Sequence, residues 1–438
     1  MRLTLKVERM AYGADAIAHD VDGRTVFVSG GVPGDTVSAI VTEDRGSFAR
    51  ARVEKVVSPS DRRVKAPCPY VDLCGGCPWA HLDYQAQLEA KRANVVDTLT
   101  RIGHYPAETA ERLVQPCVAP SDPWGYRNKV ELGVKLAHGR TIIGMHDITG
   151  KGLVKVKSCA LLSPRYAKLT KSVTGALSYM AGTRSLGLDR VGIRASVRTG
   201  EVEVALWGEP GPFPRAQVAK VLGDAAKLSS IVRVMTKGPQ KARKIAGLER
   251  LAGHGNWCEQ VGQERMWLYA PSFFQVNTKG AETLVRLVMD GLEPTEDDVA
   301  MDLYSGAGTF TLPLARVCNW VDAVESYGPA VQNLRYNLQH ANLDNADPIG
   351  GDADLEFPDS DADIIVVDPP RAGLAENVVR KLSDQPARAI AYVSCDPATL
   401  ARDLDRFEKI GVFSPVSVTP VDLFPQTFHV ENVTILRR

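Results

Sequence analysis

From about residue 280 to the C-terminus, short apolar runs alternate with stretches of helical character. The runs are VAMDLY (299–304), WVDAVE (320–325), DIIVVDPP (363–370) and AIAYVSC (389–395). Strands that alternate with helices in this way predict a parallel sheet with helices on both of its faces. Ligands of such sheets bind beyond the carboxyl ends of the strands, so the residues that follow these runs are the first candidates for a site.

The first run leads into a turn that contains two glycines. Asp302, Gly306 and Gly308 form the pattern D-x-x-x-G-x-G, which differs from the G-x-G-x-x-G of dinucleotide enzymes. Glycines at this place let the backbone approach a ligand closely. The second run ends at Glu325, 23 residues after Asp302, where a carboxylate can bind both hydroxyls of a ribose. A solvated acid at a strand end is the alternative, and Asp352, after a third strand, is a weaker candidate for contact with an adenine.

The fourth and fifth runs end in reactive side chains. Asp368 opens the sequence Asp-Pro-Pro-Arg, and the prolines cannot extend the sheet, so they end the strand. Cys395 ends the fifth run. Asp396 and Pro397 predict the N-cap and first residue of a helix, whose dipole is expected to lower the pKa of Cys395. The alternative for Cys395 is a buried thiol at the end of a strand.

The N-terminal and central regions have a different character. Residues 1–58 hold four or five short β-branched runs broken by Gly, Pro and Asp, which predict a small closed barrel of the oligonucleotide-binding kind, or a barrel with no ligand. A helix is expected at 83–102. Residues 124–267 predict strands with one helix near 164–182, so the middle of the chain is expected to be a β-rich α+β domain.

Four cysteines indicate one binding site. Cys68, Cys74 and Cys77 have the spacing C-x5-C-x2-C in a loop rich in Gly and Pro, and Cys159 is the candidate for a fourth ligand. Both tetrahedral zinc and iron–sulfur clusters usually take four ligands, so the spacing leaves both open. Cys117, Cys258 and Cys318 are expected to be buried free thiols.

Charge is distributed unevenly along the 438 residues, although the net charge is zero. Residues 151–250 hold 19 Lys and Arg against 6 Asp and Glu, whereas 281–438 hold 12 against 26. A basic region attracts phosphate backbones, and a solvated basic surface is the alternative. No apolar run reaches the 18 residues of a membrane span, and MRLTLKVERM lacks the apolar core of a signal peptide. We therefore expect a cytoplasmic protein with no membrane partner.

These motifs together resemble a known family. D-x-x-x-G-x-G is similar to motif I of class I S-adenosylmethionine-dependent methyltransferases. DPPRAG, then AYVSCDPAT some 20 residues later, and finally HVENVTIL resemble the RNA 5-methyluridine methyltransferases, and FFQVN at 273–277 is similar to that family's donor-binding segment. The barrel resembles a TRAM domain, and with the cysteine quartet it is similar to the bacterial ribosomal-RNA members. Asp396 departs from the commonest family pattern, which has Asn there.

The resemblance implies three domains and a reaction. The domains are a TRAM barrel (1–58), a central RNA-binding domain with an iron–sulfur site (59–267) and a Rossmann-like catalytic domain (268–438). Cys395 would be the nucleophile that adds to carbon 6 of uracil, and Glu431 the general base, with an acid on an edge strand as the alternative for Glu431. The donor S-adenosylmethionine would be bound by Gln275, Tyr304, Glu325, Asp352 and Asp368.

The same resemblance implies a [4Fe-4S] cluster on Cys68, Cys74, Cys77 and Cys159, with zinc as the less favoured alternative. The expected substrate is a uridine of 23S ribosomal RNA that leaves its stack to be methylated. Two alternatives remain, a methyltransferase for the T-loop of transfer RNA and a non-catalytic iron–sulfur or zinc RNA-binding protein. A monomer is expected, because the RNA partner is large.

Overall fold

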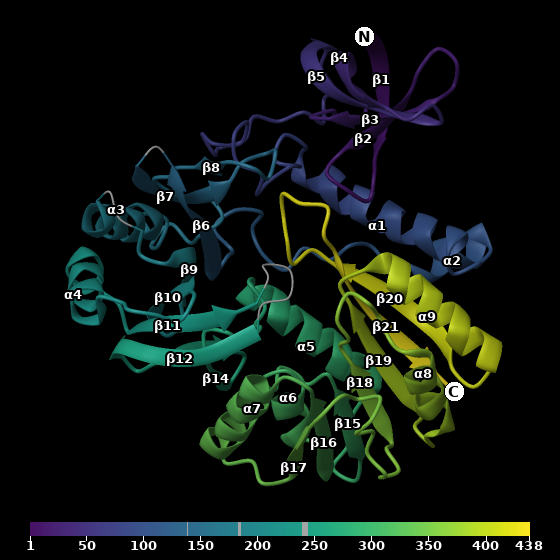
Figure 1. The fold of residues 1–438 in the computed structure, drawn as a ribbon. Coiled ribbons are helices and arrows are strands. Elements are labelled where there is room, and N and C mark those ends of the chain that lie inside the picture. Colours follow the sequence, from purple (N-terminus) through teal and green to yellow (C-terminus); the bar gives the residue numbers. More distant parts are fainter. Residues whose placement is uncertain (138, 183–184, 239–243) are drawn as a thin grey trace.

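The computed structural model describes residues 1–137, 139–182, 185–238 and 244–438 (Figure 1). Its N-terminal part is a closed barrel with the strand order β1-β2-β3-β5-β4, as the sequence predicted. Alternate apolar side chains such as Leu5, Val7 and Val37 fill the interior. The strands are β1 (Arg2–Met10), β2 (Ala16–His19), β3 (Thr25–Ser29), β4 (Thr36–Asp44) and β5 (Phe48–Ser58).

A long helix connects the barrel to the rest of the chain. α1 (Tyr84–Arg101) begins at the N-cap Asp83, whose side chain accepts a hydrogen bond from the backbone N–H of Ala86. The helix itself was predicted, but its packing was not. Val95 and Leu99 join the hydrophobic core of the C-terminal sheet, together with residues of the short helix α2 (Ala107–Leu113). Part of the segment 59–267 therefore packs against the catalytic sheet.

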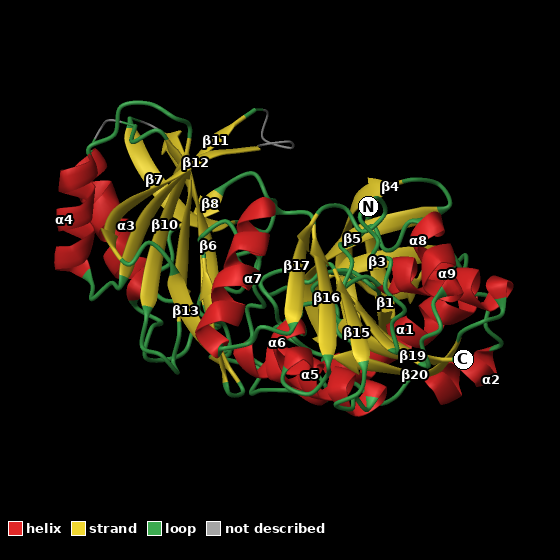
Figure 2. Cartoon of the chain, turned by 90° about the horizontal axis from the view of Figure 1, so that it is seen from below, coloured by secondary structure: helices red, strands yellow, loops and turns green. Residues whose placement is uncertain are grey.

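The central sheet has seven strands in the order β12-β11-β10-β9-β6-β7-β8. α3 (Leu169–Ala181), expected from the sequence, and α4 (Arg215–Ala225), which was missed, lie on one face of it (Figure 2). A hairpin of two strands, β13 (Trp257–Val261) and β14 (Glu264–Leu268), follows. The strands of the large sheet are β6 (Lys129–Ala137), β7 (Arg140–His146), β8 (Leu153–Val154), β9 (Leu188–Ala195), β10 (Val202–Gly208), β11 (Ser230–Lys237) and β12 (Lys244–Gly253).

The C-terminal sheet also has seven strands, in the order β17-β16-β15-β18-β19-β21-β20. Its first five strands along the chain are parallel, and β21 runs antiparallel between β19 and β20. This is the Rossmann-like sheet that the alternating pattern predicted. The strands are β15 (Val299–Leu303), β16 (Trp320–Glu325), β17 (Ala346–Gly350), β18 (Ile364–Val367), β19 (Ala389–Ser394), β20 (Ser414–Val421) and β21 (Glu431–Arg437).

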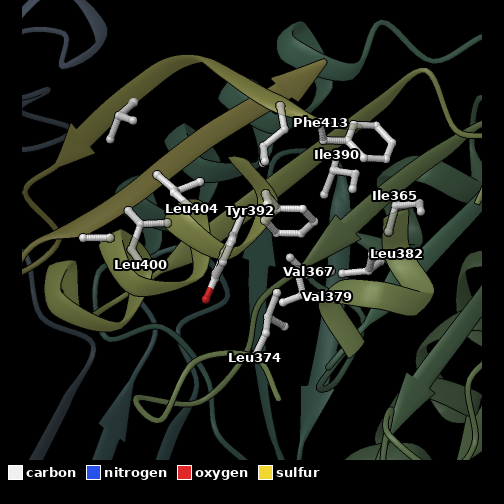
Figure 3. Close-up of a cluster of buried hydrophobic side chains, with 14 of the residues drawn as sticks. Ile365, Val367, Leu374, Val379, Leu382, Ile390, Tyr392, Leu400, Leu404 and Phe413 are labelled. Atoms are coloured by element: carbon white, nitrogen blue, oxygen red, sulfur yellow. The ribbon is translucent and has the colours of Figure 1, made fainter. Parts of the chain in front are cut away.

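Helices cover both faces of this sheet. On one face, Ile365, Val367, Ile390 and Tyr392 are buried against apolar residues of the helices (Figure 3). On the other face, Val366, Ala391 and Val433 pack with Leu284 and Val288. The helices are α5 (Thr278–Leu292), α6 (Thr311–Ala315), α7 (Gly328–Ala341), α8 (Glu376–Asp384) and α9 (Pro397–Ile410). Within the described residues, no helix has the length and apolar character that crossing a bilayer requires.

Candidate active site

The fold brings Cys395 and Glu431 to the same edge of the C-terminal sheet. Cys395 follows the last residue of β19, and Glu431 is the first residue of β21, which runs antiparallel to β19. In this register Ser394 pairs with Asn432, so Glu431 lies beside Cys395. Because β21 is flanked by β19 and β20, Glu431 is not on an edge strand, and it is 4% exposed. The interpretation of Glu431 as an edge-strand acid is therefore wrong.

Negative charge surrounds the half-buried Cys395 thiol. Burial first, and then the charges of Glu431, Asp368 and Asp396, raise its pKa to about 11, whereas Arg371 lowers it. The predicted N-cap is confirmed, since Asp396 Oδ1 accepts hydrogen bonds from Ala398 N (2.9 Å) and Thr399 N (3.2 Å). The predicted lowering of the Cys395 pKa is wrong, because burial and the charges of three acids raise it instead.

The two nearest acids are also perturbed by burial. The pKa of Glu431 rises well above its usual value, first because the group is buried and then because Asp368 is near. Burial, together with the nearby Asp302 and Glu325, raises the pKa of Asp368 to about 7. Arg371, which the sequence analysis did not single out, is a cation that lowers the pKa of both Cys395 and Glu431. The sequence offered one signal for Arg371, namely its position directly after Pro369 and Pro370 at the end of a predicted strand.

A second group of candidates surrounds the turn after β15, at the point where the strand order reverses between β15 and β18. In doubly wound sheets this is where ligands bind. Tyr304 and Gly306 adopt left-handed backbone angles, with φ of 66° and 58°. A side chain at Gly308 would collide with Leu312 and Leu334, so the turn requires glycine there. This tight turn leaves the backbone open to a ligand.

Glu325 is fixed against that turn. Its Oε2 accepts a hydrogen bond from Gly306 N (2.9 Å), and its Oε1 accepts one from Tyr327 N (2.6 Å). The half-buried carboxylate is thus not simply a solvated acid at a strand end. Each of its oxygens keeps a further lone pair that can accept from a hydroxyl group.

Two buried oxygens near the turn have no hydrogen-bond partner among the described residues. One is Oδ1 of the fully buried Asp302, whose other oxygen accepts from Thr311 Oγ1 at 2.6 Å. The other is Oε1 of Gln275, whose neighbour Phe274 packs with Ala307 of the turn. Such orphaned acceptors are the groups that a bound polar ligand can satisfy.

The outer part of this region holds Tyr304 and Asp352. Tyr304 is half-buried, and its pKa rises to about 12 because of burial and then because of Asp352 and Asp354, so these acids lie near its ring. Asp352 is exposed, and its Oδ1 accepts a hydrogen bond from Asp354 N at 3.0 Å. The five residues expected to bind the methyl donor therefore surround the carboxyl ends of β15, β16, β17 and β18. They are Gln275, Tyr304, Glu325, Asp352 and Asp368.

The four predicted cysteine ligands come from two separate loops that meet. Gly75 N donates to the carbonyl oxygen of His146 (3.0 Å), and the backbone of Cys74 forms an isolated β-bridge with Asp147. The loop that carries Cys68, Cys74 and Cys77 therefore lies on the end of β7. Within the described residues, no three His, Cys, Asp or Glu side chains are arranged so that they could hold a metal ion. The charges of the four sulfurs nevertheless interact, and the pKa of Cys77 rises to about 12 through burial and the other three thiols.

The three remaining cysteines were expected to be buried free thiols. Cys258 and Cys318 are buried and free, whereas Cys117 is half-buried and free. Tyr12, in the loop after β1, is a residue near the site that the sequence analysis missed. Its pKa is raised by burial and by Asp396 and Cys395, so a barrel residue lies near the candidate nucleophile. No local pattern signals this contact, because about 380 residues separate the two positions.

Comparison with known proteins finds relatives of both the N-terminal and the C-terminal parts of the chain. Residues 261–354 and 352–438 match the family model described as tRNA (Uracil-5-)-methyltransferase, and residues 2–53 match that of the TRAM domain. An uncharacterized RNA methyltransferase of Thermosynechococcus vestitus is 33% identical over 99% of this chain and 97% of its own length. A second uncharacterized RNA methyltransferase, of Gloeobacter violaceus, is 34% identical over 100% of this chain and 96% of its own length.

A solved structure is similar over the whole length. The tRNA (uracil-54, C5)-methyltransferase of Pyrococcus abyssi, in complex with S-adenosyl-L-homocysteine, superposes with a TM-score of 0.76. It is 26% identical in sequence, and the match covers 100% of this chain and 99% of that one.

The mostly parallel sheet, with its Gly turn after β15, defines a class I S-adenosylmethionine-dependent methyltransferase. Two relatives that are about a third identical in sequence over the full length show that the methyl acceptor of this chain is RNA. The chain belongs to the RNA uracil-5 methyltransferase family, with an N-terminal TRAM domain. It is an enzyme that methylates carbon 5 of uracil in RNA.

Proposed function

We propose that this enzyme methylates its uridine through a covalent bond between Cys395 and carbon 6 of the ring. The observation that supports this most is the position of Glu431 beside Cys395, at the start of the neighbouring antiparallel strand. Addition of the Cys395 thiolate breaks the double bond between carbons 5 and 6 and makes carbon 5 nucleophilic. S-adenosylmethionine, when bound, supplies an electrophilic methyl group.

The residues of the chain then complete the exchange. Once carbon 5 has gained the methyl group, Glu431 removes the proton of that carbon, the double bond forms again and the thiolate leaves. The high pKa of Glu431 makes it a stronger base than an exposed carboxylate. Arg371, which lowers the pKa of Cys395, favours the thiolate that starts the reaction.

This mechanism is tested with RNA that contains 5-fluorouracil. Fluorine cannot leave carbon 5 as a cation, so the methylated adduct is trapped on the enzyme. We expect a stable adduct whose mass maps to Cys395, and no adduct with Cys395→Ala. Cys258→Ala, which removes a thiol of the β13–β14 hairpin, should form the adduct normally. Methyl transfer to RNA by Cys395→Ala would contradict the mechanism.

We further propose that S-adenosylmethionine contacts Gln275, Tyr304, Glu325, Asp352 and Asp368. The orphaned Gln275 Oε1 and the position of Glu325 beside the Gly turn support this assignment. Glu325→Ala should weaken donor binding in calorimetry by at least tenfold, because it removes the acceptor for the ribose hydroxyls. Glu376→Ala, at the start of α8 and away from the turn, should leave it unchanged. Equal affinities for the two variants would reject the role of Glu325.

A [4Fe-4S] cluster on Cys68, Cys74, Cys77 and Cys159 is the proposed structural cofactor. No three described side chains are arranged to hold a metal ion in this structure. The chemistry of the donor set supports the cluster, because burial and neighbouring thiols of the set raise the pKa of Cys74, Cys77 and Cys159, and a bound cation stabilises thiolates in such an environment. The cluster would hold the loop of residues 68–77 against β7. Anaerobically purified protein should be brown, with about four irons per chain. One tightly bound zinc with no iron would overturn the assignment.

We propose 23S ribosomal RNA as the substrate, supported by the occurrence of the barrel and the cysteine quartet in one chain. Transfer RNA is the second candidate, because the Pyrococcus abyssi relative is a tRNA (uracil-54, C5)-methyltransferase that matches over the whole length. Mapping 5-methyluridine in RNA from a strain that lacks the gene decides between them. Loss from 23S RNA is expected, and loss confined to the T-loop of transfer RNA would refute the ribosomal assignment.

A further inference from the structure

The N-terminal barrel and the catalytic domain each pack one aromatic side chain against the hydrophobic core of the other. Tyr12, in the loop between β1 and β2, packs against the hydrophobic core of the catalytic sheet. Phe428, in the loop between β20 and β21, packs against the core of the barrel. The two rings meet edge to face, with their centroids 5.8 Å apart and an interplanar angle of 87°. Each domain thus holds a ring of the other, and Figure 1 shows the barrel above the C-terminal loop that contains Phe428.

Hydrogen bonds hold both loops in place. The indole Nε1 of Trp79 donates to the carbonyl oxygen of Gly13 (3.0 Å), and Trp79 N donates to the carbonyl oxygen of Gln426 (3.0 Å). Gln87 of α1 exchanges two further hydrogen bonds with Gln426 (3.0 and 2.9 Å). Trp79 is fully buried, so these bonds are protected from water. The loop of Tyr12 and the loop of Phe428 are therefore joined in one hydrogen-bonded assembly through Trp79.

This assembly adjoins the reacting groups. Glu431 is three residues after Phe428, and it begins β21 where the restrained loop ends. The ring of Tyr12 lies near Cys395, Asp396 and Glu431, since the charges of all three act on its hydroxyl.

We propose that Tyr12 is a positioning residue for methyl transfer, which fixes the loop of Phe428 and hence the placement of Glu431 beside Cys395. The barrel then contributes to the chemical step in addition to binding RNA. This inference rests on the proposed roles of Cys395 and Glu431, and it goes beyond them by assigning part of the active site to the TRAM domain.

The test measures RNA affinity and the single-turnover rate of methyl transfer separately. Tyr12→Ala should lower the rate at saturating RNA and donor by at least tenfold, with the Kd for RNA changed less than threefold. Tyr12→Phe keeps the ring and should retain most of the rate. The matched control is Phe27→Ala, because Phe27 makes a similar edge-to-face contact within the barrel, with Phe48 at 5.7 Å. It should leave the saturating rate unchanged.

Two further measurements separate positioning from loss of folding. Phe428→Ala should lower the rate as Tyr12→Ala does, and the double variant should be no slower than either single one, because both break the same contact. The pH–rate profile of Tyr12→Ala should also shift, since water then reaches Cys395 and Glu431.

A Tyr12→Ala enzyme with the wild-type rate and weakened RNA affinity would overturn the inference, as would multiplicative effects of the two substitutions. Inactivity of the Cys395→Ala control together with full activity of Tyr12→Ala would reject only the role of Tyr12. An active Cys395→Ala would instead reject the proposed mechanism.

Discussion

The reactivity of Cys395 depends on the balance of charges around a single sulfur atom. Three carboxylates raise its pKa, and Arg371 is a cation that lowers it. Arg371 is exposed, so its effect is reduced by solvent but also adjustable by bound RNA. A thiolate is the nucleophilic form, and its fraction falls tenfold for each unit by which the thiol pKa exceeds the pH.

We therefore predict that Arg371→Gln slows formation of the Cys395 adduct at neutral pH. The pKa of Cys395 rises when the cation is removed, so less thiolate is present at any pH below it. The pH at which the rate of adduct formation rises should move upward. Rates of adduct formation measured in quenched reactions between pH 6 and 9.5 would show this shift. Arg380→Gln is the control, because Arg380 is an exposed residue of α8 that pairs with Glu376. An unshifted profile for Arg371→Gln would contradict the prediction.

At this scale, sequence reasoning found the residues but not their surroundings. Cys395 and Glu431 were identified because they stand at strand ends within recognisable motifs. The direction of the Cys395 pKa was missed, because it depends first on burial and then on Glu431 and Asp368, which are distant along the chain. Tyr12 was missed for the same reason, since only the tertiary fold brings it to the site.

At the level of single elements, Asp396 of the AYVSCDPAT motif stabilises the start of α9. Asp396 satisfies two of the free backbone N–H groups there. Asp396→Ala should lower the free energy of unfolding by about 1 kcal/mol, as loss of an N-cap does. Asp396→Asn, which restores the commonest residue of the family pattern, should cost much less because Asn caps equally well. Urea unfolding of the three proteins measures both, and an equal loss for Ala and Asn would contradict the capping role.

The elements themselves were predicted well where periodicity was strong. The strands β15, β16, β18 and β19 follow from uninterrupted apolar runs, and α1 from its helical spacing. α4 was missed because it buries only Val218 and Leu222, which is too short an apolar stripe to stand out. The packing partner of α1 was not predictable either, since an apolar stripe shows that a helix is buried but not against which sheet.

At the scale of the whole molecule, one buried ion pair joins α1 to the catalytic domain. Lys91 Nζ lies 2.5 Å from Asp422 Oδ1, both side chains are fully buried, and Lys91 also donates to the carbonyl oxygen of Phe424. Asp422 directly follows β20 and precedes the loop of Phe428. The pair thus fixes the same loop that Trp79 and Gln87 hold from their side.

Removing one partner of this pair should be costly, because it leaves a buried charge without compensation. We predict that Lys91→Met lowers the free energy of unfolding by about 3–5 kcal/mol. Arg286→Ala, which breaks an exposed pair with Asp290, should cost at most about 1 kcal/mol. Lys91→Met combined with Asp422→Leu should recover much of the loss, since no unpaired carboxylate remains. Urea unfolding followed by tryptophan fluorescence measures all three. If Lys91→Met cost no more than Arg286→Ala, the pair would not hold α1 to the catalytic domain, and the loop before Glu431 would depend on the aromatic contact and on the hydrogen bonds of Trp79 and Gln87.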